Sequence, residues 1–70
     1  MAKLAITNTI RIQRFHHNEM TQQQLADRVG VTRQTIAAIE SARYSPSLEV
    51  AFKIAAVFEQ PLENIFQFTP

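Results

Sequence analysis

The stretch from Met20 to Glu40, MTQQQLADRVGVTRQTIAAIE, decides the fold of this 70-residue chain. Thr21 stands three residues before Gln24, and this spacing is the capping box with which many helices begin. Gly30, the only glycine in the sequence, follows where a helix needs a residue that readily adopts a positive φ. The pattern therefore predicts a helix that starts after Thr21 and ends before Gly30. Its expected buried face consists of Leu25, Ala26 and Val29.

A second helix is predicted directly after the glycine, from Arg33 to Glu40, with Thr32 as its cap. Two helices joined by so short a turn cross at a steep angle, and the small Ala26 lets their backbones approach. Such a pair is a helix-turn-helix, whose second helix can enter the major groove of DNA with its N-terminus first. An ordinary corner in a helical bundle is the alternative. The exposed face favours the helix-turn-helix, because it is polar or small where a merely solvated helix carries Glu and Lys. This face consists of Thr32, Arg33, Gln34, Thr35 and Ala38.

Three more helices are predicted outside this unit. The first spans Thr9 to His17 and takes Asn8 or Thr9 as its cap. The second follows the turn Ser45-Pro46-Ser47, and the third runs from Leu62 to Phe66. The core face of the second of these helices is expected to consist of Leu48, Ala51, Phe52, Ala55 and Phe58.

Both ends of the chain alternate apolar and polar residues, which is the pattern of a strand. The two segments are Lys3 to Thr7 and Ile65 to Thr69, and each is too short to be stable alone. We therefore expect them to pair with each other.

Size and composition limit the class of protein. Seventy residues with 46% hydrophobic side chains predict one compact domain over residues 1–70, which is too small for most enzymes. So short a chain is near the lower limit for independent folding, and a subunit partner is a natural source of stability. Without cysteine, it can form neither a disulfide nor a cysteine-based zinc site. The longest apolar stretch, Val50 to Phe58, is too short for a membrane helix, and the N-terminus lacks the pattern of a secretory signal, so we expect a cytoplasmic protein.

The charge is unevenly distributed along the chain. Residues 1–43 hold six basic and three acidic side chains, a net charge of +3, whereas residues 44–70 hold one basic and three acidic side chains, a net charge of −2. A basic front part is suited to facing phosphates, although many solvated helical faces have the same composition.

The segment Met20 to Glu40, followed by Arg43-Tyr-Ser-Pro-Ser-Leu48, resembles the Cro/C1-type (XRE) helix-turn-helix transcriptional regulators. The likeness extends from Ile10 to Phe68 and is closest to the small stand-alone members, including cytolysin-operon-type repressors, whose chains also end in a motif like Pro61 to Gln67, PLENIFQ. The resemblance implies an all-α, five-helix, lambda-repressor-like DNA-binding domain with its helix-turn-helix at residues 21–40. It also implies a small two-stranded sheet from the chain ends, and a homodimer bound to a double-stranded DNA operator.

The resemblance assigns base reading to the start of the second helix of the motif. Arg33 and Gln34 match the main base-reading positions of the family, and arginine suits guanine O6 and N7 as glutamine suits adenine N6 and N7. The alternative for Arg33 is a phosphate contact without base preference. Thr32 and Thr35 can offer a methyl group to thymine or a hydroxyl to phosphate, and Ala38 can give only an apolar contact.

The DNA backbone is expected to meet both ends of the helix-turn-helix. Thr21 and Gln22 start its first helix, where backbone amides and the helix dipole favour an anion, although Gln22 can also be a plain capping-turn residue. Arg43 and Tyr44 follow its second helix and have the charge and reach that phosphate contacts need. An acidic, apolar tail is poorly suited to facing DNA. The dimer interface is therefore assigned to Leu62, Ile65, Phe66 and Phe68.

Other prominent residues receive structural roles. Arg14 and Glu40 match a family pair that ties the first helix to the third. His16 and His17 are neighbours on a helix and point in different directions, so no shared metal site is assigned to them. Where the family usually has Asn-Gly after the recognition helix, this chain has Ser41-Ala42, so a non-glycine residue is expected to take a positive φ. The aromatic side chains assigned to the core and the dimer contact, rather than to base stacking, are Phe52, Phe58, Phe66 and Phe68.

The leading hypothesis is a sequence-specific, dimeric DNA-binding transcriptional regulator, most simply a repressor that blocks polymerase at a promoter. A dimer of such domains reads half-sites about 10 base pairs apart. The alternative is an antitoxin-like or adaptor module of the same fold, whose main partner is a protein and which can dispense with Arg33 and Gln34. An enzyme is the poorest option, because the sequence offers no glycine-rich loop and no nucleophile with a base. No cofactor, metal or small-molecule ligand is assigned.

Overall fold

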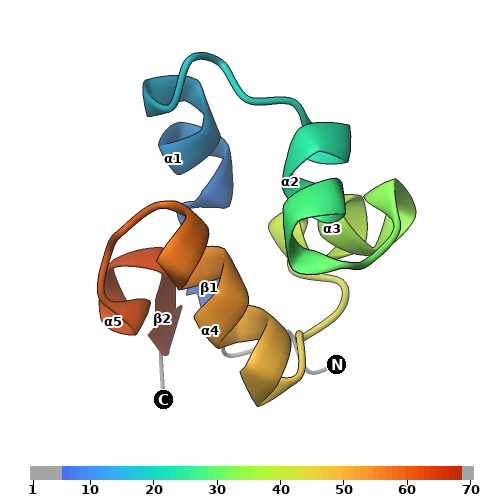
Figure 1. Cartoon of the computed structure of the whole chain (residues 1–70). Coiled ribbons are helices and arrows are strands. Elements are labelled where there is room, and N and C mark those ends of the chain that lie inside the picture. Colours follow the sequence, from blue (N-terminus) through green and yellow to red (C-terminus); the bar gives the residue numbers. More distant parts are fainter. Residues whose placement is uncertain (1–5, 69–70) are drawn as a thin grey trace.

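Residues 6–68 form five helices and one two-stranded antiparallel sheet (Figure 1). The computed structural model describes residues 6–68. The prediction of a helical domain with a small sheet is confirmed. In chain order the elements are β1 (Ile6–Asn8), α1 (Ile10–His16), α2 (Gln22–Val29), α3 (Arg33–Glu40), α4 (Leu48–Val57), α5 (Leu62–Ile65) and β2 (Phe66–Phe68).

The start and end of α2 follow the local signals of the sequence. Thr21 Oγ1 accepts a hydrogen bond from the backbone N–H of Gln24 at 3.0 Å, and Gln24 Oε1 accepts from the backbone N–H of Thr21 at 2.9 Å. Both halves of the capping box are therefore present. Gly30 ends the helix with φ of 79°, and its N–H donates to the carbonyl of Ala26 at 2.9 Å. The predicted bounds of this helix are confirmed.

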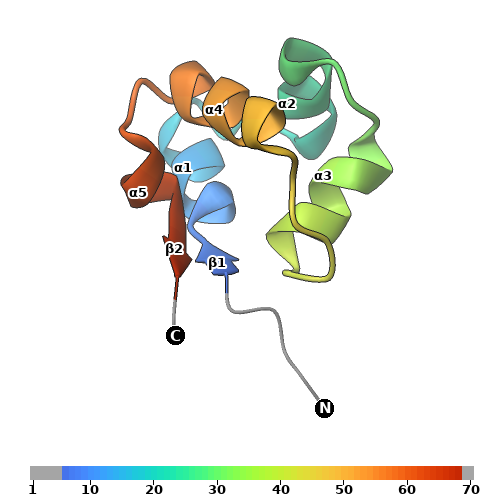
Figure 2. The same ribbon diagram turned by 90° about the horizontal axis from the view of Figure 1, so that it is seen from below.

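A single apolar core joins the helices. Buried faces of α2 pack against both α3 and α4, and α4 in turn packs against α5. In Figures 1 and 2, α4 lies between the α2–α3 pair and the α5–β2 segment. No buried polar or charged residue interrupts the core within residues 6–68. The buried cluster comprises Ile10, Met20, Leu25, Ala26, Val29, Ile36, Ile39, Ile54, Ala55, Phe58 and Ile65.

The predicted core face of α4 is wrong at two positions. Leu48 and Phe52 are 69% and 53% exposed, whereas Ile54, which the prediction left out, is fully buried. Leu48 occupies the first turn of α4, and Phe52 lies to one side of the buried stripe. Only the part of α4 that faces α2 and α5 is covered, so apolar residues outside that part stay in solvent. The residues of α4 and its C-cap that are buried are Ala51, Ile54, Ala55 and Phe58.

The two ends of the chain pair as the alternation predicts. Strand β1 runs antiparallel to β2, with Ile6 opposite Phe68 and Asn8 opposite Phe66, and Figure 2 shows the two strands side by side. Ile65, the first position of the second predicted strand, belongs to α5 instead, and residues 3–5 and 69 lie outside the described part of the chain. Helix α5 ends at Ile65, one residue before its predicted end, because Phe66 already has the extended backbone of β2.

Asn8 and Thr9 make different hydrogen bonds at the start of α1. Asn8 Oδ1 accepts from the backbone N–H of Ile10 at 3.1 Å, and its Nδ2 donates to the carbonyl of Ile39 at 2.9 Å. The hydroxyl of Thr9 donates instead to the carbonyl of Asn64 at 2.7 Å. These bonds tie the first turn of α1 to the last turn of α3 and to α5.

The end of α3 carries the backbone strain that the sequence predicts. Ala42 has φ of 61°, its N–H donates to Ile39, and the N–H of Arg43 donates to Ala38 at 3.0 Å. This pair of bonds is the Schellman motif, whose left-handed position is usually glycine. An alanine Cβ in that conformation costs about 1 kcal/mol.

We therefore predict that Ala42→Gly stabilises the protein by about 1 kcal/mol, which raises Tm by about 5 °C for a domain of this size. Thermal unfolding followed by circular dichroism measures this shift. Gly30→Ala is the matched control: a Cβ at Gly30 meets nothing within 4 Å, so it introduces only the left-handed strain and is expected to lower Tm by a similar amount. An Ala42→Gly protein that melts no higher than the parent would contradict the assigned backbone conformation.

Candidate nucleic-acid interface

The start of α3 presents two polar side chains that no other described residue engages. Arg33 and Gln34 are both exposed, and within residues 6–68 neither side chain makes a hydrogen bond or an ion pair. They occupy the first two positions of α3, so they project from the N-terminal end of the helix. Two long polar side chains left free at a helix N-terminus are available for a partner.

The capping residues of α3 are arranged differently. Thr32 Oγ1 accepts from the backbone N–H of Thr35 at 3.1 Å, and the hydroxyls of Thr32 and Thr35 lie 3.0 Å apart within hydrogen-bonding distance. The two hydroxyls thus engage each other, and the methyl groups of these residues are also available to a partner. Thr35 and Ala38 are half-buried, whereas Thr32 is exposed.

The N-terminus of α2 lies next to the C-terminal end of α3, where Gln22 contacts Glu40. The capping box occupies the hydroxyl of Thr21 and the backbone N–H of Gln24, which leaves the N–H groups of Gln22 and Gln23 without a partner inside the helix. These free N–H groups and the helix dipole favour an anion at this end of α2. The side chain of Gln22 is half-buried, and its Nε2 donates to Glu40 Oε1 at 3.2 Å.

The loop after α3 holds the third group of polar residues. Ser41 Oγ donates to the carbonyl of Ala38 at 3.2 Å and accepts from Arg43 Nε at 3.0 Å. The guanidinium of Arg43 is thereby held close to the end of α3. Tyr44, which is 54% exposed, follows directly. A cation and a hydroxyl group of long reach therefore stand at the C-terminal end of α3.

An ion pair joins three helices beneath this surface. Arg14 of α1 donates from Nη2 to Glu40 Oε1 at 3.1 Å and from Nε to Glu40 Oε2, so the contact is bidentate. Arg14 Nη1 also donates to the carbonyl of Met20, just before α2, at 2.7 Å. Only 16% of the Arg14 side chain and 10% of the Glu40 side chain are exposed. The predicted tie between the first and third helices is present, and it reaches the start of α2 as well.

The adjacent histidines have separate surroundings. The half-buried ring of His17 meets Phe58 edge to face, with centroids 5.1 Å apart, and its Nδ1 lies 3.0 Å from the carbonyl of Gln13. His16 is exposed and contacts the ring of Phe15 at 5.6 Å. No group of three or more His, Asp or Glu side chains that could hold a metal ion occurs within the described residues.

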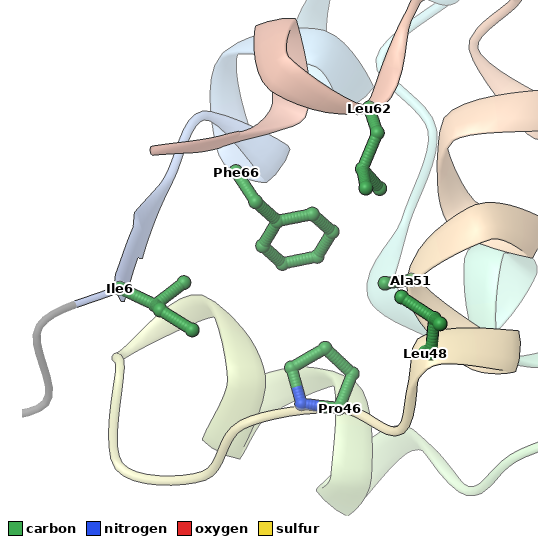
Figure 3. A pocket seen from close by; sticks show the side chains of 6 residues that line it. All are labelled: Ile6, Pro46, Leu48, Ala51, Leu62 and Phe66. Carbon is green, nitrogen blue, oxygen red and sulfur yellow. The ribbon is translucent and has the colours of Figure 1, made fainter. Parts of the chain in front are cut away.

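Apolar side chains of β1, the loop before α4, α4 and the α5–β2 segment come together at one place on the molecule. A groove with a volume of about 340 Å³ opens there, and Figure 3 shows the side chains that line it. Ile6 and Leu48, which sequence reasoning did not place here, lie at its mouth and are 37% and 69% exposed. The residues that line the groove are Ile6, Pro46, Leu48, Ala51, Leu62 and Phe66.

The residues assigned to the dimer interface are not all accessible. Phe68 is 68% exposed, and Leu62 and Phe66 are half-buried beside the groove. Ile65, by contrast, is fully buried within the core of the chain, so its assignment to an interface has to be corrected. Ile65 is the last residue of helix α5, and its side chain is part of the buried core cluster. Phe52 is exposed as well, and of the four predicted core or dimer aromatics only Phe58 is fully buried.

Known proteins resemble this chain in sequence and fold. A family model described as helix-turn-helix matches residues 10–65. An HTH-type transcriptional regulator of Archaeoglobus fulgidus is 51% identical over 59 residues, which cover 83% of this chain and 83% of that protein. An HTH-type transcriptional regulator of Methanothermobacter thermautotrophicus is 55% identical over 56 residues, covering 76% and 81%. The crystal structure of a candidate DNA-binding protein from Bacteroides fragilis has the same fold, with a TM-score of 0.75 and 22% identity over 89% of this chain and 98% of that one.

None of the helices among residues 6–68 is long and apolar enough to span a lipid bilayer.

Proposed function

Because the chain belongs to the Cro/C1-type helix-turn-helix family of transcriptional regulators, which are DNA-binding proteins and not enzymes, we propose that it is a sequence-specific repressor that binds its operator as a homodimer. The observation that carries the proposal is the free pair Arg33 and Gln34 at the N-terminus of α3. A helix that enters the major groove with this end first brings both side chains to the edges of bases. Arginine then pairs with guanine and glutamine with adenine.

Phosphate contacts at the start of α2 and in the loop that follows α3 complete the proposed DNA surface. Thr21 and Gln22 bring the free N–H groups of α2 to one strand, and Arg43 and Tyr44 bring a cation and a hydroxyl group to the backbone beyond α3. Such contacts fix the register of the protein on the duplex, and the bases then supply specificity. Thr32, Thr35 and Ala38 add methyl contacts in the groove.

The proposed homodimer uses the α5–β2 face, which we define as Leu62, Phe66 and Phe68. This face lies away from α2 and α3, so two copies can associate through it and keep both recognition helices free (Figures 1 and 2). A two-fold dimer doubles the number of phosphate contacts and predicts an inverted repeat with half-site centres about 10 base pairs apart. Bound at a promoter, the dimer excludes polymerase.

The proposal includes neither a cofactor nor a small-molecule effector. We place the protein in the cytoplasm, which is the location that its family of transcriptional regulators suggests.

Selection of bound duplexes from a random library at near-physiological salt, with sedimentation of the same sample, tests the proposal. We expect an inverted repeat with half-site centres about one helical turn apart, bound by a two-chain species. Recovery of unrelated sequences, with an affinity that depends only on salt, would contradict the proposed operator binding and direct attention to a protein partner. A single chain on a single half-site would contradict the dimer alone.

Phe68→Ala is predicted to weaken self-association by at least about thirtyfold, because two-fold symmetry removes the side chain from both copies at about 1 kcal/mol or more each. Phe68 is 68% exposed, so the fold of one chain is not expected to depend on it. Sedimentation equilibrium measures the dimer dissociation constant.

Phe15→Ala is the matched control for this prediction. Phe15 is 65% exposed, a fraction close to that of Phe68, but it belongs to α1 and lies outside the α5–β2 face. The control variant is expected to dimerise like the parent. Equal weakening by both substitutions, or by neither, would rule out the assigned face.

A further inference from the structure

We propose that Glu40 is a positioning residue for DNA binding, because it holds the side chain of Gln22 at the point where α2 meets a phosphate. The inference rests on the proposed function and adds to the structural role of the Arg14–Glu40 pair. A residue at the C-terminal end of α3 thus positions a side chain at the N-terminal end of α2.

The contact is set by the crossing of the two helices. Gln22 is the first residue of α2 and Glu40 is the last residue of α3, and Gln22 Nε2 donates to Glu40 Oε1 at 3.2 Å. A carboxylate only accepts hydrogen bonds, so it fixes which end of the Gln22 amide is turned toward it. The carboxylate takes one of the two Nε2 hydrogens, and the second hydrogen remains for a phosphate oxygen.

Arg14 makes this arrangement compatible with DNA. An unpaired carboxylate beside Gln22 would repel a phosphate, but the bidentate contact with Arg14 neutralises its charge. The same guanidinium donates to the carbonyl of Met20, two residues before Gln22, at 2.7 Å. The backbone that enters α2 and the first side chain of α2 are thus held by the same ion pair.

Holding the amide before DNA arrives favours binding. A glutamine side chain that is free in solution loses rotational freedom when it contacts a phosphate. The Gln22 side chain is half-buried and bonded to Glu40, so much of this ordering already exists in the unbound protein. Together with the free N–H groups of Gln22 and Gln23, it forms a preorganised set of donors.

The experiment compares the effect of Gln22→Ala in two backgrounds, with the duplex that the parent selects from a random library as the probe. In the parent, Gln22→Ala is expected to weaken binding about thirtyfold, the value of one hydrogen bond to a phosphate, at about 1 kcal/mol, in each of two half-sites. In the Arg14→Met/Glu40→Met background the Gln22 contact is already lost. Binding is therefore expected to be weaker before the substitution, and Gln22→Ala is expected to add no further loss. An equal effect of Gln22→Ala in both backgrounds would overturn the positioning role.

Two controls make the result specific to the Gln22–Glu40 contact. Gln23 is exposed and donates to Asp27 at 2.8 Å, so Gln23→Ala is expected to have the same effect in both backgrounds. Glu40→Gln retains an oxygen that can accept from Gln22, so Gln22→Ala is expected to keep its effect in that background. Circular dichroism checks that each background is folded. If the double methionine variant does not fold, Glu40→Asp replaces it, because the shorter side chain withdraws the acceptor from Gln22.

Nuclear magnetic resonance of the DNA-free protein separates this inference from the proposed function. The Gln22 side-chain amide protons are expected to exchange with solvent at least several-fold more slowly in the parent than in the chosen background. Equal exchange would overturn the positioning role, even if the parent binds an operator. If the Gln22 amide is protected but the protein selects no duplex, the contact between Gln22 and Glu40 is supported. That result would nevertheless overturn both the proposed DNA binding and the positioning role of Glu40 in it.

Discussion

Replacing Arg33 and Gln34 together with alanine is expected to lower affinity for the selected operator about a thousandfold, and affinity for unrelated duplexes by no more than about tenfold. The estimate takes about 1 kcal/mol for each of two bidentate base contacts in each of two half-sites. Both side chains are exposed, so the fold is expected to be unaffected. Fluorescence anisotropy with operator and scrambled duplexes measures the two affinities.

Single substitutions distinguish base reading from phosphate binding by Arg33. If Arg33 reads guanine, Arg33→Lys keeps the charge but loses the two-pronged contact, so preference at one base pair is expected to relax. If Arg33 binds a phosphate, Arg33→Ala weakens binding to all sequences alike and reduces the salt dependence by about one charge per half-site. Lys53→Ala removes the same charge from α4 and is the matched control, with no expected effect on base preference. Operator preference that survives the double alanine substitution would place specificity elsewhere.

The helix-turn-helix was predictable because its signals are local. The capping box of α2 joins residues three apart, and the turn at Gly30 depends on one backbone conformation. The positive φ of Ala42 followed from comparing Ser41-Ala42 with the usual Asn-Gly of the family, and it is confirmed. Each of these features needs only a few neighbouring residues to form, so their pattern can be found in the sequence.

The limits of the core could not be predicted in the same way. The sequence shows that Leu48, Phe52 and Ile54 are apolar residues of one predicted helix. It does not show which of them a neighbouring helix covers. The structure buries Ile54 and exposes the other two, because α2 and α5 cover only part of α4. Ile65 was misassigned for a related reason: its direction depends on where α5 ends and β2 begins.

The contact between Gln22 and Glu40 could not be predicted from the sequence either. Eighteen positions separate the two residues, and their distance depends on the angle at which α2 crosses α3. The resemblance paired Glu40 with Arg14 and assigned Gln22 to a phosphate, without joining the two roles. Only the packed arrangement brings all three side chains together.

Arg14→Met is expected to destabilise the protein by about 3 kcal/mol, because it leaves the largely covered Glu40 carboxylate without its cation. The Glu40 side chain is 10% exposed, and after the substitution only Gln22 remains as a side-chain donor to it among residues 6–68. For a domain of this size the loss lowers Tm by about 15 °C, which thermal unfolding by circular dichroism measures. Arg14 also donates to the carbonyl of Met20, and that bond is lost too.

The double variant Arg14→Met/Glu40→Met shows which part of this loss belongs to the unpaired charge. Apolar side chains of similar volume often replace a buried ion pair without net loss, so Tm is expected to recover most of the way to the parent value. A double variant as unstable as Arg14→Met alone would mean that the bond to Met20, and not the charge of Glu40, accounts for the loss. We expect the double variant to recover its stability but not its affinity for DNA. The methionines fill the space between the helices, but they offer Gln22 no hydrogen-bond acceptor. This combination of results would separate the role of the pair in folding from its role in binding.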